Sequence, residues 1–576
     1  MVPRSHIEQC GWGRVFELPA MRQLGTRRLD PSHTRKFIVA SVRTLIAALS
    51  MMVARPGTAQ DSILNAPSTA ALTANQFRGV DRCRDCHRAA TPERIKAGVT
   101  DFISLNESEV WVSDIHSKSF ELIDPAKSDL GKQICNKLGI KDIHESRACL
   151  SCHSDWRPES ERPPTYERGV ACESCHGPSR KWDADHSEAI WRAKPVAEKE
   201  ALGMVDVRNP IKRAEQCFGC HIGNAAEGKI ITHEMYAAGH PPLPGIEIES
   251  FAAQMPRHWR YLDEKVADAK SNHAGNEADA PPFLHFDRFV HKNHRYLKLG
   301  GENANEQILA HHHRAAAVVL GGVVALRESI ELMRDLAVDE EPRKHTWPEL
   351  ASFECRACHH ELATPSRRQE QRTGSIPGRP MFANWPTALI RLSIRRVSEN
   401  RTSYDNKLAE FHTKLTAVKA ELQRSPFGSR PRIHDTCSQL SDWLTTEVVE
   451  PVSAKPFDDR AVADAINVLI VIGSTEQHDY DSARQIAWAL RVLACDALKD
   501  DTRGRTILEF LETLAPQLRL DLPNSPAHSC HPVFTIDEPR QLTPLAADPP
   551  TTLEAPILYD PERFRAQMQT LRESLR

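Results

Sequence analysis

The chain of 576 residues lacks the features that mark several large classes of protein. It has no Gly-rich loop of the kind that cradles phosphate groups. Its 74 basic and 77 acidic residues nearly cancel, and the net charge of -3 argues against nucleic-acid binding. No segment shows a convincing strand-type alternation of apolar and polar residues. These absences leave a mainly helical protein whose chemistry does not depend on nucleotides or nucleic acids.

Long apolar runs are also missing after the N-terminal segment. The longest, AAAVVLGGVVAL at residues 315–326, is too short to span a bilayer and suits a buried helix. Near the N-terminus, basic residues precede the run FIVASVRTLIAALSMMVA, and small residues follow it at 57–59. This order is typical of a secretory signal peptide over residues 1–59, so we expect a periplasmic protein. Arg43 interrupts the run, which disfavours the alternative of a retained membrane anchor.

Cysteine, in contrast, is abundant, and ten of the fifteen cysteines fall in Cys-x-x-Cys-His units. The two-residue spacing lets both thiols reach the vinyl groups of one haem, and the adjoining His then lies under the porphyrin, where it can bind iron. Zinc ribbons and redox couples also use Cys-x-x-Cys, but neither needs a His after every second cysteine. The sequence therefore predicts five covalently bound haem c groups. In chain order, the first to fifth units are Cys83/Cys86/His87, Cys149/Cys152/His153, Cys172/Cys175/His176, Cys217/Cys220/His221 and Cys355/Cys358/His359.

The five remaining cysteines have no ligand spacing among themselves; they are Cys10, Cys135, Cys437, Cys495 and Cys530. Cys437 and Cys495 could form a disulfide in an oxidising compartment. Two buried free thiols are the alternative.

The composition divides the rest of the chain into segments. Residues 60–79 are a small, polar linker, and residues 80–305 hold four haem units among many Pro, Gly and charged residues. Because this part has few apolar periodicities, we expect the haems themselves to form its core.

The second half reads as helical. Residues 306–386 contain an apolar helical stretch, the fifth unit and a loop rich in Pro, Gly and Arg. Residues 387–520 show the three-four apolar spacing of a helical bundle, and 521–576 form a Pro-rich tail with a terminal helix. We therefore predict a mainly α protein: a multihaem cytochrome c domain with a haem-filled core, short helices and loops, followed by a helical C-terminal domain.

The second axial position of each iron separates an electron carrier from an enzyme. A second His gives a six-coordinate iron that only passes electrons, whereas an open position lets a small molecule bind and react. The runs WVSDIHSKSF, GVACESCHGPSRKW and ITHEMYAAGHPPL, with MPRHW after them, accompany the haem units in order. Over residues 80 to 260 the chain thereby resembles the multihaem cytochrome c family of the cytochrome c554 type. The part from Phe353 onward resembles uncharacterised exported multihaem proteins with a helical C-terminal half.

The resemblance implies electron transfer, and it implies four distal ligands: His116, His186, His233 and His240. Four distal ligands for five irons would leave one iron open. His144 is a reserve candidate, and one of His311, His312 and His313 could serve the fifth haem. For the other histidines of the haem region, a surface or supporting role is the default interpretation; these are His258, His285, His291 and His294.

Taken together, the sequence favours a periplasmic electron carrier over an enzyme. The expected partners are redox proteins, either a quinol-oxidising membrane complex or a periplasmic dehydrogenase or reductase. The alternative is a multihaem oxidoreductase that acts on a small nitrogen or sulfur compound at a five-coordinate haem. The chain has no Cys-x-x-Cys-Lys unit, so the usual catalytic haem of pentahaem nitrite reductase is not supported.

Overall fold

The computed structural model describes most of the chain after the N-terminal segment. The described residues are 77–88, 107–155, 168–188, 190–191, 194–259, 261, 311–340, 345–359, 364, 379–424, 427–497, 501–521, 556 and 558–576. Within them the chain is helical, and extended pairing is limited to one isolated bridge between Asn224 and Lys229. The predicted mainly α fold class is therefore confirmed. The expected signal peptide and most of the Pro-rich tail lie outside these residues.

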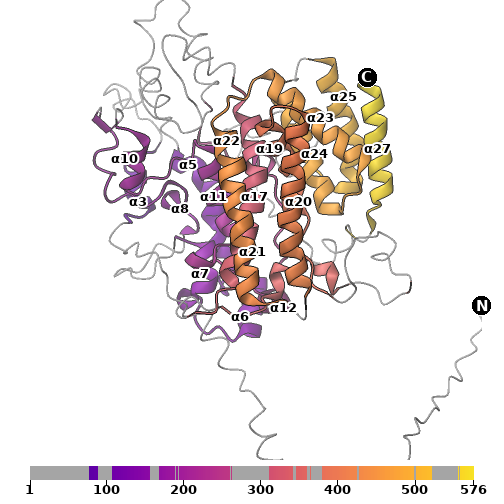
Figure 1. Ribbon diagram of the computed structural model, residues 1–576. Helices are drawn as coiled ribbons and strands as arrows, with labels where there is room; N and C mark the ends of the chain where they lie inside the picture. The colour runs from indigo at the N-terminus through magenta and orange to yellow at the C-terminus, as the bar shows by residue number, and fades with distance from the viewer. Residues whose placement is uncertain are drawn as a thin grey trace, which may run out of the picture. The chain divides into compact units, whose positions relative to one another are not determined.

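Short helices carry the first four haem units (Figure 1). Polar caps delimit several of them: Ser128 accepts the N–H of Gly131 at the start of α6, and Asn209 accepts the N–H of Ile211 before α11. Pro210 fits the first turn of α11, where its missing N–H is not needed. The elements are α3 (Val80–Arg84), α5 (Glu107–Val112), η3 (Ile115–Leu122), α6 (Asp129–Leu138), η4 (Ile143–Glu145), α7 (Arg147–His153), α8 (Cys172–His176), α10 (Val196–Ala201), α11 (Pro210–His221), η6 (Ala225–Glu227), α12 (His233–Ala238) and α13 (Ile248–Ala252).

Longer helices dominate the second half of the chain. A long apolar helix comes first, then the short turns around the fifth haem unit, then the helices of the C-terminal bundle. They are α17 (His313–Leu336), η8 (Leu350–Ser352), η9 (Cys355–Ala357), η10 (Trp385–Thr387), α19 (Ile390–Val397), α20 (Arg401–Gln423), α21 (Arg430–Trp443), the π-helical η11 (Leu444–Val449), α22 (Glu450–Ser453), α23 (Asp459–Thr475), α24 (Tyr480–Ala497), α25 (Thr502–Leu518) and α27 (Pro561–Ser574). No helix in the described part of the chain combines the length and the apolar character needed to cross a membrane.

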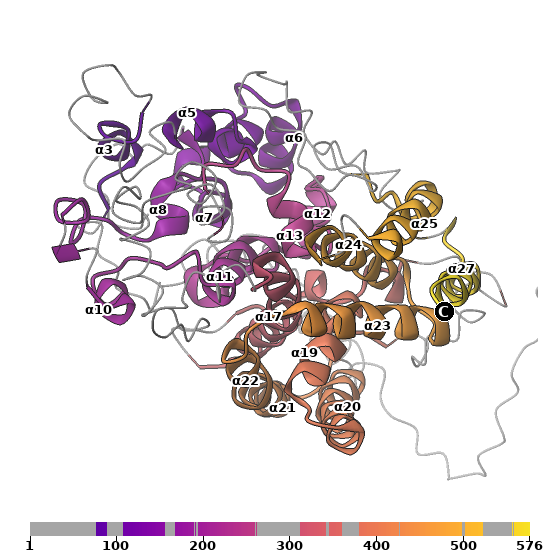
Figure 2. The same cartoon turned by 90° about the horizontal axis from the view of Figure 1, so that it is seen from above.

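Helix α17 joins the haem-unit helices to the C-terminal bundle. It packs against α11 on one side and against α19, α21 and α24 on others, and Figure 2 shows it between α11 and α19. An ordinary amphipathic helix has one apolar face, but the Ala, Val, Leu and Gly residues of α17 are buried around its whole circumference. From the sequence, this helix belongs to the segment 306–386 that also holds the fifth haem unit. In the structure, its apolar residues are part of the hydrophobic core of the bundle.

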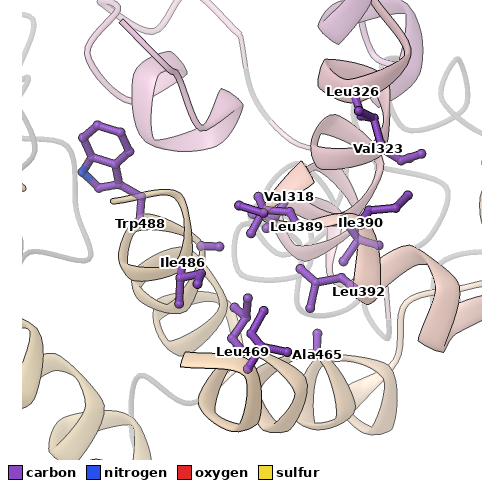
Figure 3. Close-up of a cluster of buried hydrophobic side chains, with 14 of the residues drawn as sticks. Val318, Val323, Leu326, Leu389, Ile390, Leu392, Ala465, Leu469, Ile486 and Trp488 are labelled. Atoms are coloured by element: carbon purple, nitrogen blue, oxygen red, sulfur yellow. The ribbon is translucent and has the colours of Figure 1, made fainter. Parts of the chain in front are cut away.

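The bundle core is continuous and closely packed. In Figure 3, Val318 and Val323 of α17 lie near Leu389 and Ile390 at the start of α19, and Leu469 of α23 lies near Ile486 of α24. The three-four stripes recognised in the sequence account for much of this packing. In α20, for example, Phe411, Leu415, Val418 and Leu422 are buried.

Two adjacent glycines let α17 approach its neighbours closely. A Cβ added at Gly321 would lie 2.4 Å from Cγ2 of Ile248, and one at Gly322 would lie 2.6 Å from Cβ of Leu389. Real side chains do not approach so closely, so only glycine fits at either position without movement of α13 or α19.

The cysteines outside the haem units decide between the two sequence-based alternatives for Cys437. Cys437 is a free, fully buried thiol on α21, so the structure excludes the alternative in which Cys437 pairs with Cys495 and agrees with a buried free thiol at Cys437. Burial raises the pKa of the Cys437 thiol to about 12, which keeps it protonated and unreactive at neutral pH. Cys495 does form a disulfide, with a cysteine outside the described residues.

Candidate haem sites

Each haem unit occupies roughly one helical turn. In the first unit the N–H of His87 donates to the carbonyl of Cys83 over 2.9 Å, and in the fifth unit His359 donates to Cys355 over 2.8 Å. On such a turn, residues i, i+3 and i+4 share one face. The local fold therefore presents both thiols and the imidazole of a unit to the same side, as attachment to one haem requires.

The haem-unit region encloses a large cavity in place of a continuous core. Its volume is about 2230 Å³, and all motif cysteines except Cys358 line it. The apolar clusters beside it are small; one consists of Phe120, Cys135, Ile143 and Leu150. A cavity lined by thiols, imidazoles and apolar side chains such as Trp111, Leu130 and Ile134 fits residues that pack around large apolar groups.

The imidazoles of the region come in facing pairs. Each proximal His of the five units lies opposite a second His from a distant part of the chain. The pairs, with the distance between ring centres, are His87 and His186 (6.1 Å), His153 and His240 (6.2 Å), His176 and His258 (6.5 Å), His221 and His116 (6.4 Å), and His359 and His233 (6.1 Å).

This separation lies in the outer range of ring contacts, and it also matches two bonds to a shared metal. An imidazole nitrogen binds a metal at about 2 Å, and its ring centre lies about 1 Å behind it, so two axial imidazoles place their ring centres roughly 6 Å apart. All five pairs meet this condition. The residues present therefore fit a haem iron between each pair of rings.

Hydrogen bonds orient several of these rings. Nδ1 of His153 lies 3.0 Å from the carbonyl of Ser119, and Nδ1 of His186 lies 2.6 Å from the carbonyl of Asp183. Nδ1 of His240 likewise lies 2.7 Å from the carbonyl of Pro241. Because a carbonyl only accepts, Nδ1 is the protonated nitrogen in these rings, and Nε2 keeps the lone pair that a metal needs.

Carboxylates support two further rings. Nδ1 of His116 lies 3.0 Å from Oδ1 of Asp114, and Nδ1 of His87 lies 3.4 Å from Oε2 of Glu107. Burial opposes a charge on His116, but the hydrogen bond and the charge of Asp114 outweigh it and raise the pKa of this imidazole. A carboxylate partner makes an imidazole a more basic ligand than a carbonyl partner does.

Burial keeps most of the paired rings neutral. Loss of hydration lowers the pKa of His153, His176 and His221 to about 4. The same cause lowers the pKa of His186 and His258. These imidazoles are thus unprotonated at neutral pH and can act as ligands.

The units also lie next to one another. The thiols of Cys83 and Cys172 lie close enough to shift the pKa of one another, as do those of Cys152 and Cys220. Cys175 and Cys220 interact electrostatically. These approaches link the first unit to the third, the third to the fourth, and the fourth to the second.

The four distal candidates taken from the family resemblance all face a proximal His. The remaining partner is His258, for which a surface or supporting role was the default interpretation, and which faces His176. The run MPRHW that contains it had been recognised as part of the resemblance, so a signal for this residue was present in the sequence.

The reserve candidates are not the second ring of any of these five pairs. His311 accepts the N–H of Phe457 over 3.1 Å, and Nε2 of His312 lies 2.7 Å from Oδ1 of Asp459, so both contact the bundle. His313 lines the cavity, and its ring centre lies 4.6 Å from that of His311. His144 packs on Phe120. His285, His291 and His294 lie outside the described residues.

Comparisons with known proteins agree with the motifs. Residues 82–177 match the family model described as cytochrome c554 and c-prime. The chain is 25% identical over 152 residues to cytochrome c-554 of Nitrosomonas europaea, a stretch that covers 25% of this chain and 57% of that protein. The chain thus spans little more than half the length of this relative. No solved structure matches the chain.

Proposed function

Because residues 82–177 belong to the cytochrome c554 family, we propose that this protein is an exported c-type cytochrome that binds five covalent haems and carries electrons between redox partners. The observation that carries the proposal is the set of five facing imidazole pairs. With both axial positions filled by His, an iron has no open site for a substrate. The pairing therefore supports a carrier and not the alternative of catalysis at a five-coordinate haem.

The chain's own residues set the conditions for electron transfer. Bound haem supplies an iron that accepts and releases one electron. Ser119, Asp183 and Pro241 hold imidazole rings in one orientation through their carbonyls, so little rearrangement accompanies a change of charge. Asp114 makes His116 a more basic ligand, which stabilises the oxidised state at that site.

The order of neighbouring units supports a continuous path. The approaches of the motif thiols give the sequence first, third, fourth, second unit. Electron tunnelling falls off steeply with distance, so adjacent sites exchange electrons much faster than separated ones. A chain of adjacent sites suits a protein that links two partners.

Two features support export. The N-terminal segment has the order of a secretory signal peptide. In addition, the disulfide of Cys495 is typical of an oxidising compartment. We propose periplasmic redox proteins or a quinol-oxidising membrane complex as partners.

The mass and the electron paramagnetic resonance spectrum of the oxidised, exported protein test the proposal. We expect a mass increase equal to five haems, five low-spin ferric signals and no optical change on addition of cyanide or nitric oxide. Fewer than five attached haems would contradict the haem count. A high-spin iron that binds either ligand would contradict the carrier and favour a catalyst.

A further inference from the structure

Helix α12 supplies imidazoles to two different haem sites. His233, its first residue, faces His359 of the fifth unit, and His240, just beyond its end, faces His153 of the second unit. The six residues of α12 rise about 9 Å, so the two imidazoles at its ends belong to neighbouring sites. The family match ends at residue 177, so it contains the first three units and neither the fourth nor the fifth.

Contacts at both ends hold α12 in place. At its start, Thr232 accepts the N–H of Met235 over 3.2 Å, and Glu349 accepts the N–H of His233 over 2.8 Å. At its end, Gly239 has a φ of 122°, and a Cβ there would lie 2.8 Å from Nε2 of Gln133 on α6. The helix is thereby fixed between the residues that precede the fifth unit and those that surround the second, which sets the spacing of the two sites.

One aromatic ring lies between these sites. Tyr236 is on α12 between the two ligands, and its ring centre is 6.1 Å from that of His240. Its hydroxyl accepts the N–H of Leu243 over 3.2 Å, which fixes the ring. Tyr236 lines the same cavity as Cys355 and His359 of the fifth unit. On α12 it lies between His233, which faces the fifth unit, and His240, which faces the second.

The fifth unit lies at the margin of the cavity. Its Cys358 is exposed and is the motif cysteine that does not line the cavity, whereas both cysteines of the second unit line it. An exposed unit at the end of a row of sites is accessible to a partner, and an internal one is not.

We propose that the fifth haem is the terminal member of the chain and exchanges electrons with the second haem across α12, with Tyr236 filling the space between them. One electron leaves one iron, which is oxidised, and arrives at the other iron, which is reduced. No proton or further reactant takes part. The inference rests on the proposed function, because it needs five loaded sites, and it adds the path by which the fifth is connected.

The test uses the full-length, haem-loaded protein with the fifth haem marked by His233→Met. A Met ligand raises the reduction potential of a His-ligated haem, so the marked haem becomes the final acceptor. After photochemical injection of electrons, the rate at which the marked haem is reduced is compared among Tyr236→Phe, Tyr236→Leu and Tyr404→Leu. Tyr404 is a tyrosine of α20 that packs under Arg401 and serves as the matched control.

We expect Tyr236→Leu to slow the reduction of the marked haem several-fold, while Tyr236→Phe and Tyr404→Leu leave it unchanged. Equal rates in all variants would overturn the proposed path. If His233→Met changes none of the haem spectra, then His233 is not an axial ligand, and the failure lies in the proposed function.

A second measurement covers the case in which Tyr236→Leu loses haem. The double variant Cys355→Ser, Cys358→Ser removes the fifth haem, and His240→Met marks the second. Removal of a neighbouring charge should shift the potential of the marked second haem and leave the other three unchanged. A shift at a different haem would overturn the connection through α12.

Discussion

At the scale of single residues, the imidazole pairs decide what the sites can do. His258 belongs to a segment far along the chain from His176, and burial lowers the pKa of its imidazole, which keeps the ring neutral. Two other distal rings, His186 and His240, have a carbonyl partner at Nδ1.

Removal of His258 should convert one carrier site into a ligand-binding site. In His258→Ala, the iron opposite His176 would lose its second imidazole and become five-coordinate, because His258 is the imidazole that pairs with His176 among the described residues. We expect one of five low-spin signals to be replaced by a high-spin signal, with binding of one equivalent of cyanide. The measurement is electron paramagnetic resonance with an optical titration.

His144→Ala is the matched control, since His144 is exposed and packs on Phe120 without facing a proximal His. This control should keep all five low-spin signals. If His258→Ala also keeps all five, the pairing of His258 with His176 is incorrect.

Part of the site could be predicted from the sequence because its chemistry is local. The thiols and proximal imidazoles of a unit lie within five consecutive residues, and one helical turn suffices to bring them together. The distal ligands have no such local signature, because a ring such as His233 meets His359 only after the chain has folded. Family motifs supplied four of them, but the pairing of each ring with its haem required the tertiary structure.

At the scale of secondary-structure elements, α17 shows the limit of pattern reading. Its apolar run was recognised as a buried helix, but periodicity cannot show which elements pack on each side of a helix that is apolar all round. The sequence alone does not explain the glycines at 321 and 322, because the close approach of α13 and α19 to them arises only in the folded chain.

Substitution of Gly322 should destabilise the bundle. The added Cβ of Gly322→Ala would lie 2.6 Å from Cβ of Leu389, an atom attached to the backbone of the start of α19 that cannot rotate away. Overpacking of this kind costs about 1–3 kcal/mol. We expect a lower midpoint of chemical unfolding of the bundle, followed by far-ultraviolet circular dichroism, with the haem absorbance of the folded protein unchanged.

Thr413→Ala, on the exposed face of α20, provides the control and should leave the midpoint within experimental error. An unchanged midpoint for Gly322→Ala would mean that α17 and α19 can separate at little cost, contrary to the packing seen in Figure 3.

At the scale of the whole molecule, the two halves of the described chain are held together differently. The bundle has one continuous hydrophobic core that runs from α17 to α27. The haem-unit region has small apolar clusters around a cavity of about 2230 Å³. Burial of apolar surface is the main driving force of folding, so the first half depends on its haems for a core and the second half does not.

This difference predicts that haem attachment controls the folding of one half only. In a variant with all ten motif cysteines changed to Ser, the bundle helices should retain slow amide hydrogen exchange, because α17, α21, α23 and α24 bury one another. The described helices from α3 to α10 should exchange within seconds, because they are too short to persist without tertiary contacts. Hydrogen exchange followed by mass spectrometry measures both halves in one sample, with the haem-loaded protein as the reference.

Helix α11 lies at the boundary between the two halves, because it packs on α17 and its Ile211 contacts the bundle core. The protection that α11 keeps in the haem-free variant would show how far the bundle can order the haem-unit region without haem. Equal protection in both halves of the haem-free variant would mean that the cavity walls support themselves and that the haems are not the core.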